Sequence, residues 1–213
     1  MFYVGLDLGQ RRDHSAIAVV EKYDAVRPAH GAGRWTAAVE APLVVRHVER
    51  APLGTPYPKV VQRLKRIVGS DALAGQCAVA VDSTGVGAPV IEMLRGAGLG
   101  CEIAGVTITG GERESARYGA GGPEWSVPKR DLIVGLQVLL EEDRLKIARG
   151  LKDGASLVKE LMDMRISRPD HRRVRMGAEG SGEHDDLVIA VALACWRAKR
   201  KQAGFVRARL AGI

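Results

Sequence analysis

Three short segments near the start of the chain have the hydrophobic pattern of β-strands. Residues 2–8 and 15–21 are apolar or β-branched runs bounded by polar turn residues, and residues 35–48 show a similar pattern farther along. Residues 10–14 form a tight link between the first two runs. Together the segments predict an antiparallel meander of three strands.

From residue 55 the pattern alternates between helices and strands. A Thr-Pro start signal predicts a helix over residues 55–68, with Thr55 as its N-cap. Apolar runs predict strands at residues 78–82 and 102–109, and helical spacing between them predicts a helix at residues 88–95. Because helices and strands alternate, these strands should pair in parallel through right-handed crossovers.

The rest of the chain is predicted to be mainly helical, with two irregular segments. Residues 110–126 are rich in glycine and predict a mobile loop, and residues 170–182 predict a second loop or a hairpin. Apolar residues at three- and four-residue spacing predict helices over residues 128–142 and 156–164. A last helix over residues 185–201 is apolar on every side for nearly three turns, so we expect it to be buried.

The composition is typical of one α/β domain. The chain has 213 residues, of which 46% are hydrophobic and 27% charged, and a domain of this length buries roughly 70% of its unfolded surface without disulfides or structural metals. We predict a single domain over residues 1–213 with a mixed central sheet, antiparallel in its first three strands and parallel afterwards, flanked by helices. The longest apolar run, residues 187–196, is about half the length of a membrane span. The few scattered cysteines, Cys77, Cys101 and Cys195, are typical of buried free thiols, and we expect a cytoplasmic protein.

Positive charge gathers in the last quarter of the chain. The formal net charge is +7, and from residue 165 onward there are eleven Lys or Arg residues and five acidic ones. This distribution favours a polyanionic partner such as nucleic acid. A solvated basic surface with a basic tail from about residue 197 is the alternative interpretation.

Acidic residues occur at three places that a folded core would bring together. Asp7 lies within an apolar strand, where an unpaired carboxylate is costly; Asp82 ends the central strand; Asp185 and Asp186 open the last helix. If the two strands are neighbours and the helix crosses them, the carboxylates converge. Converging carboxylates without cysteine or clustered histidine favour Mg²⁺ or Mn²⁺ over zinc. Taken singly, each acid could instead be structural, as a hydrogen-bonding residue, a loop cap or a favourable charge at a helix N-terminus.

Three motifs carry a resemblance to a known family. They are Gly5-Leu6-Asp7-Leu8-Gly9 with the run from Asp13 to Val20, Val81-Asp82-Ser83-Thr84-Gly85-Val86-Gly87, and His184-Asp185-Asp186-Leu187-Val188. In this order they resemble the nuclease domain of phage large terminase subunits, which has the ribonuclease H-like fold shared with RuvC-type resolvases. The resemblance covers essentially the whole chain. It implies an endonuclease that cuts duplex DNA during genome packaging by two-metal phosphodiester hydrolysis, with Mg²⁺ or Mn²⁺ as cofactor.

The resemblance also implies roles for individual residues. Asp7, Asp82 and one of the last two acids would be catalytic and bind metal; we favour Asp186, since adjacent helical residues point about 100° apart. Asp185 and His184 are the candidates for a fourth ligand. RuvC-type resolvases have another Asp one helical turn beyond their ligand, where this chain has isoleucine, and this departure counts against a resolvase.

The partners that the resemblance implies are double-stranded DNA, a packaging ATPase motor, the small terminase subunit and the portal, in the cytoplasm of a bacterial host. Candidate phosphate contacts are Lys129, Arg130, Arg172, Arg173 and Arg175; ordinary exposed surface charge is their alternative role. The sequence contains no G-x-x-x-x-G-K-[ST] phosphate loop, so we expect either a separated domain or a stand-alone protein that works with a motor from another gene.

Two other functions are compatible with the same motifs. The turns after Asp7 and Asp82 also resemble the phosphate-binding turns of actin-like ATPases and sugar kinases, although those proteins clasp nucleotide between two such domains. A catalytically silent DNA-binding module is the other alternative. Metal-dependent nicking of plasmid separates the nuclease from both, and nucleotide hydrolysis would favour the kinase-like function.

Overall fold

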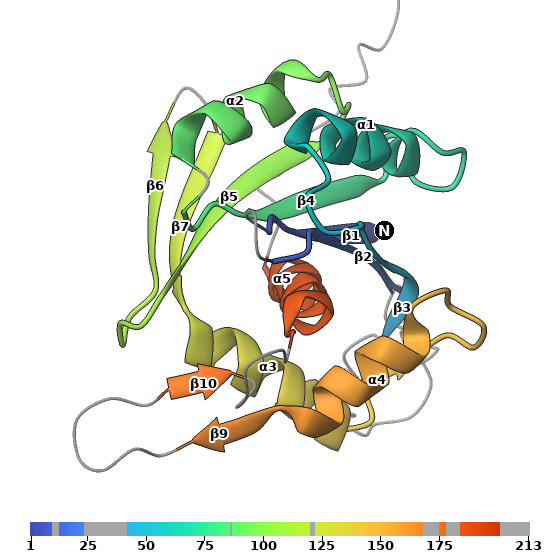
Figure 1. The fold of residues 1–213 in the computed structure, drawn as a ribbon, viewed down its shortest axis with the longest axis vertical. Coiled ribbons are helices and arrows are strands. Elements are labelled where there is room, and N and C mark those ends of the chain that lie inside the picture. Colours follow the sequence, from blue (N-terminus) through green and yellow to red (C-terminus); the bar gives the residue numbers. More distant parts are fainter. Residues whose placement is uncertain are drawn as a thin grey trace, which may run out of the picture.

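An eight-stranded mixed sheet with the strand order β6-β7-β5-β4-β1-β2-β3-β8 forms the centre of the fold (Figure 1). The computed structural model describes residues 1–9, 13–23, 42–85, 87–119, 122–167, 175–177 and 184–200. The strands of this sheet are β1 (Phe2–Asp7), β2 (Ala16–Lys22), β3 (Leu43–Arg50), β4 (Cys77–Asp82), β5 (Glu102–Thr109), β6 (Ser115–Gly119), β7 (Gly122–Pro128) and β8 (Leu145–Ile147). The helices are α1 (Tyr57–Val68), α2 (Gly87–Gly96), α3 (Lys129–Glu141), α4 (Gly154–Asp163) and α5 (Asp186–Lys199), and β9 (Arg165–Ser167) pairs with β10 (Arg175–Gly177) in a separate two-stranded sheet.

The sheet combines an antiparallel half with a parallel half, as the sequence predicts. β1, β2 and β3 form the antiparallel meander. β4 pairs in parallel with β1 and β5 in parallel with β4, with α1 and α2 in the crossovers. β7 extends the parallel half, β6 closes that edge in antiparallel pairing, and β8 lies parallel to β3 at the other edge.

Alternating side chains divide the core into two layers. On one face of the sheet, Val4 and Leu6 of β1 pack with residues of α1 and α2. On the other face, Tyr3 of β1 packs with α5, and α3 and α4 cover the far side of that helix (Figure 1). Being enclosed between the sheet and two helices explains why α5 is apolar on all sides.

The prediction of a loop over residues 110–126 is wrong, because β6 and most of β7 lie there. The glycines of this segment cluster before β6 and at the β6–β7 turn, where Gly122 has a φ of 100°. Between these points β6 pairs with β7, and β7 in turn pairs with β5 from Gly105 to Thr109. Pairing with an existing strand supplies an order that the composition does not reveal.

Several boundaries also differ from the predictions. Thr55 is not the cap of α1: its hydroxyl donates a hydrogen bond to the carbonyl of Pro52 at 2.6 Å, and the helix begins after Pro56. β3 begins at Leu43, and residues 24–41 lie outside the described part of the chain. Of the predicted loop or hairpin at residues 170–182, only β10 is described. α5 continues to Lys199, past residue 197 at which the basic tail is predicted to begin, and residues 201–213 are outside the described part.

The cysteines are free thiols, as predicted: Cys77 and Cys195 are buried, whereas Cys101 is only half-buried. Among the helices that the structure describes, none is long and apolar enough to cross a membrane.

Candidate metal centre

Strand register places two carboxylates side by side at one end of the sheet. β1 and β4 are paired in parallel up to Leu6 and Val81, so the next residues, Asp7 and Asp82, end adjacent strands. Ala80 packs in the core on the α5 side, and alternation therefore turns Asp82 to that side, together with its strand neighbour Asp7. The two acids thus face the helix that carries the third acidic motif.

Gly5 allows α5 to approach β1 closely enough to bring that motif to the same place. A Cβ atom on Gly5 would lie 1.8 Å from the carbonyl oxygen of Ala190 and 2.9 Å from the backbone nitrogen of Ala194. Asp186 lies one turn before Ala190, about 6 Å along the helix axis, and Asp7 lies about 6.6 Å beyond Gly5 along the strand. The two distances, measured from the contact between Gly5 and Ala190, are nearly the same. Asp186 therefore lies beside Asp7, and the two carboxylates repel each other.

The acids resist ionisation because they are buried together. Burial, and then the charges of the neighbouring carboxylates, raise the pKa of Asp7 well above its usual value. Burial also raises the pKa of Asp82, although the backbone N–H of Thr84 donates a hydrogen bond to this carboxylate at 2.8 Å. Burial likewise raises the pKa of Asp186, against the opposing charge of Arg50. Three raised carboxyl pKa values at one place indicate that the cluster is short of positive charge.

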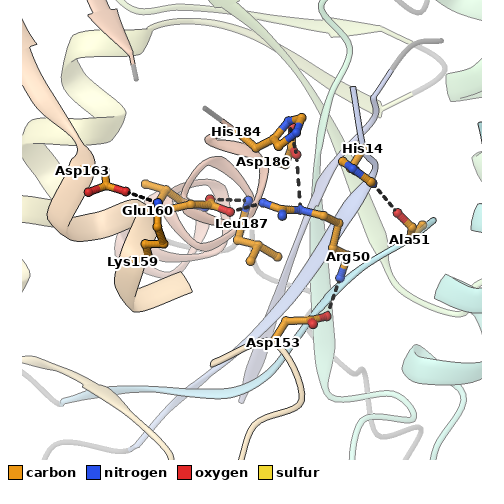
Figure 2. Close-up of polar contacts among 11 residues, drawn as sticks. His14, Arg50, Ala51, Asp153, Lys159, Glu160, Asp163, His184, Asp186 and Leu187 are labelled. Atoms are coloured by element: carbon orange, nitrogen blue, oxygen red, sulfur yellow. Dashed lines mark hydrogen bonds and ion pairs between the residues drawn. The ribbon is translucent and has the colours of Figure 1, made fainter. Parts of the chain in front are cut away.

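Two cations of the chain pair with the acids of α5. Lys129, the first residue of α3, places its ammonium group 2.6 Å from Asp185. Arg50, the last residue of β3, places its Nε 3.4 Å from Asp186 and also pairs with Glu160 (Figure 2). Each of the two adjacent acids therefore has its own cation, Lys129 from α3 for Asp185 and Arg50 from β3 for Asp186.

Glu160 is a residue of the candidate site that was not predicted from the sequence. It lies on α4, yet its carboxylate accepts hydrogen bonds from the backbone N–H groups of Leu187 at 3.1 Å and Val188 at 3.2 Å (Figure 2). It therefore satisfies donors in the first turn of α5, as an N-cap would. Burial raises its pKa to about 7, although Arg50 opposes this rise. The sequence offers one signal for it: Glu160 follows Leu157 by three residues, so both side chains share a face of the helix. In the structure this face is the inner one, because Leu157 is buried.

Two histidines border the cluster. His14 donates a hydrogen bond from Nδ1 to the carbonyl of Ala51 at 2.8 Å. The ring of His184 lies edge-on to it, with the centroids 5.0 Å apart, and its Nδ1 is 3.8 Å from Asp186 (Figure 2). His184, a predicted candidate for a fourth ligand, thus lies beside the acids.

The donor set suits a hard divalent cation. The Oδ2 atom of Asp186 is buried and accepts no hydrogen bond from any described residue. Within the described part of the chain, Asp7 forms no ion pair, and the charge of Lys129 is outweighed by burial and by the neighbouring carboxylates. A bound ion would satisfy both acids. The ligand set is not closed, however. In the described ranges no three His, Cys, Asp or Glu side chains form a group that could hold an ion.

The predicted phosphate contacts are only partly described. Lys129 points into the acidic cluster, and Arg130 is exposed, with its Nε 3.3 Å from Asp131. Arg172 and Arg173 lie outside the described residues, and of Arg175 only the backbone in β10 is described. A role of these arginines in DNA binding stays a prediction.

No protein-family model and no curated protein sequence matches the chain. Solved structures do match. The large terminase nuclease of thermophilic phage G20c, with bound magnesium, has a TM-score of 0.61 and 22% identity over 92% of this chain and 81% of that one. The nuclease domain of the bacteriophage SPP1 large terminase, with bound manganese, has a TM-score of 0.54 and 12% identity over 92% and 86% of the two chains. The corresponding domain of bacterial virus Sf6, with manganese and beta-thujaplicinol, has a TM-score of 0.59 and 15% identity over 91% and 87%. Over nearly its whole length, this chain therefore has the ribonuclease H-like fold of phage large terminase nuclease domains.

Proposed function

We propose that the chain is a metal-dependent endonuclease that hydrolyses phosphodiester bonds of duplex DNA, as the nuclease of a phage genome-packaging terminase. The observation that carries the proposal is the convergence of Asp7, Asp82 and Asp186 from β1, β4 and α5 at one end of the sheet. Magnesium in one similar nuclease and manganese in two others support Mg²⁺ or Mn²⁺ as cofactor. A cluster with this excess of carboxylates over cations favours two metal ions.

The carboxylates of Asp7, Asp82 and Asp186 would hold the ions, with Asp185 as a further ligand. Bound divalent cations supply an activated water at neutral pH and stabilise the departing oxygen. The sheet fixes the first two acids, because each ends a strand that is hydrogen-bonded on both sides. Glu160 fixes the first turn of α5 and hence the position of Asp186.

The partners that we propose are duplex DNA, a packaging ATPase motor, the small terminase subunit and the portal, in the cytoplasm of a bacterial host. They rest on the shared fold and on the basic balance of the chain, whose formal net charge is +7.

Cleavage of supercoiled plasmid in Mg²⁺, Mn²⁺ or EDTA tests the proposal. We expect nicked and linear products with either metal, and none in EDTA. Asp7→Asn and Asp82→Asn should each lower the rate by about a thousandfold or more, because each removes a ligand charge from the centre. Asp71→Asn makes the same chemical change at an exposed turn and should cleave as the unaltered protein does.

Circular dichroism should show that all three variants are folded. Cleavage that persists in both Asp7→Asn and Asp82→Asn would contradict the site assignment. Absence of cleavage by the unaltered protein with either metal would contradict the proposed activity.

A further inference from the structure

A cleft lined by cations opens beside the candidate metal centre. It has a volume of about 570 Å³ and lies between the ends of β2 and β3, residues 51–56, α1 and the segment before α4. Its charged lining residues are Arg50, Lys59, Arg63, Arg66, Lys152 and the single carboxylate Glu49. The cleft is therefore strongly positive.

The carboxylate in the cleft does not neutralise all of these cations. Arg63 donates two hydrogen bonds to Glu49, at 2.7 and 2.6 Å, and His47 lies 3.2 Å from the same carboxylate. Burial would raise the pKa of Glu49, but these partners outweigh it and hold the pKa at about 2. Glu49 is thus ionised at neutral pH, and its carboxylate is paired with Arg63 and His47.

Three of the lining cations have no such partner. Lys59, Arg66 and Lys152 are exposed, and none of their side chains forms an ion pair or hydrogen bond with any residue that the structure describes. Three exposed and uncompensated cations around one concavity suit an anion with several separate charges, rather than one buried carboxylate.

The sheet links the cleft to the metal centre. Asp7 of β1 pairs with Ala16 of β2, which pairs with Arg50 of β3. Arg50 reaches Asp186 on one side and lines the cleft on the other. Two strand spacings separate Asp7 from Arg50, about 10 Å, and one DNA strand advances about 3.4 Å per phosphate along its axis. A strand with a phosphate at the acids would therefore reach the cleft within a few nucleotides.

We propose that this cleft binds the sugar–phosphate backbone of DNA on one side of the bond to be cut, with Lys59, Arg66 and Lys152 contacting successive phosphates. The proposal rests on the proposed nuclease function for the identity of the polyanion. It assigns backbone binding to α1 and to the segment before α4, which contain none of the phosphate contacts predicted from sequence. Contacts of this kind position the duplex without reading its bases.

The test is binding of a fluorescent duplex of about 30 base pairs by the full chain in EDTA, measured by anisotropy over a range of salt concentrations. The cleft variant is Lys59→Ala/Arg66→Ala/Lys152→Ala. The control is Lys65→Ala/Lys146→Ala/Lys159→Ala, which removes the same charge from exposed positions that do not line the cleft. All six side chains are exposed, so both variants should fold.

We expect the cleft variant to bind at least about tenfold more weakly and the control less than about threefold. The slope of log K against log salt should become shallower by about 2 to 3 in the cleft variant only, because each lost phosphate contact removes about 0.9. Equal losses in the two variants, no loss in either, or no DNA binding by the unaltered protein would each overturn the proposal.

This outcome is separable from that of the nuclease proposal because binding is measured without metal. Cleft-dependent binding by a protein that cuts no plasmid would support the cleft and contradict the nuclease. If the protein does cut, the cleft variant should show a raised KM with kcat unchanged. A KM equal to that of the control variant would overturn the cleft while leaving the nuclease intact.

Discussion

Helix α5 has ion pairs at both of its ends, but at the N-terminal end two further carboxylates, those of Asp7 and Asp82, face the same place. Arg197, which is 4% exposed, lies 2.8 Å from Glu102. One turn away, Arg200 pairs with Glu114 and stacks over the ring of Trp196, with 3.8 Å from its guanidinium carbon to the ring centroid. These are one-to-one contacts of the kind that make buried charges tolerable.

Among the described residues at the N-terminal end, acids outnumber cations. Asp185 and Asp186 have Lys129 and Arg50, but Asp7 and Asp82 face the same cluster. Repulsion among these carboxylates lowers the stability of the folded protein. The C-terminal end of the same helix has no such repulsion among its described residues. This difference is the one expected if the acidic end holds the proposed metal ions.

Gly5→Ala should have the largest effect on stability, because it disturbs the contact that positions both ends of α5. The added Cβ would lie 1.8 Å from the backbone oxygen of Ala190, and backbone cannot move aside as a flexible side chain can. We expect a loss of about 3 to 4 kcal/mol in the free energy of unfolding, measured by urea denaturation. Gly96→Ala, with no atom within 4 Å of the new Cβ, should change it by less than about 1 kcal/mol. A similar small change for Gly5→Ala would contradict the close seating of the helix.

Arg197→Leu tests the balanced end and should have the next largest effect. It leaves Glu102 without its partner, and the side chain of Glu102 is 26% exposed, so water relieves part of the penalty. The expected loss is about 2 to 3 kcal/mol in the free energy of unfolding. Arg130→Leu breaks an exposed pair with Asp131 and should cost less than about 1 kcal/mol. Equal losses in the two variants would mean that the C-terminal pair does not stabilise the helix.

Asp7→Asn tests the acidic end and should change stability in the opposite direction. Because the pKa of Asp7 is raised in the folded protein, its contribution to stability is full below the unfolded pKa and is lost as the pH rises through the folded pKa. Asparagine has no charge to lose, so the variant should be more stable near neutral pH by on the order of 1 kcal/mol. The advantage should vanish as the pH falls toward about 4. Thermal melts of Asp7→Asn and Asp71→Asn across this range measure the effect, and a lower melting temperature for Asp7→Asn at pH 7 would contradict it.

Much of the fold could be predicted because the apolar periodicity is strong. The boundaries predicted for residues 102–109 coincide with β5, and the first strand, the central strand and the last helix agree within a few residues. β6, β7 and β8 escaped prediction. The first two lie in glycine-rich sequence, and β8 has three residues; such strands derive their order from the neighbours with which they pair.

The residues of the candidate site likewise fall into those that could be predicted from the sequence and those that could not. Asp7 and Asp82 stand out because a carboxylate is unusual inside or at the end of an apolar strand. Arg50 and Glu160 do not stand out, since each is an ordinary charge at the end of a strand or on a helix. Their relation to Asp186 depends on strand register and on how α4 packs against α5, and neither can be read from local sequence.

Glu160→Gln should have the smallest effect, and it isolates one member of the acidic end. Burial raises the pKa of Glu160 from its ordinary value of 4.5 to about 7. Its contribution to stability is therefore full below pH 4.5 and is lost as the pH rises through 7. Glutamine keeps an oxygen that accepts from the backbone N–H groups of Leu187 and Val188 but does not titrate. Between about pH 5 and pH 8, the unaltered protein should lose more unfolding free energy than Glu160→Gln. The difference should be about 1 kcal/mol or less, because the carboxyl is partly screened by solvent.

Urea denaturation at several pH values measures this difference, and Glu92→Gln, an exposed change on α2, should follow the unaltered protein. Identical pH profiles for Glu160→Gln and the unaltered protein would show that the excess charge at this end of α5 is confined to the aspartates.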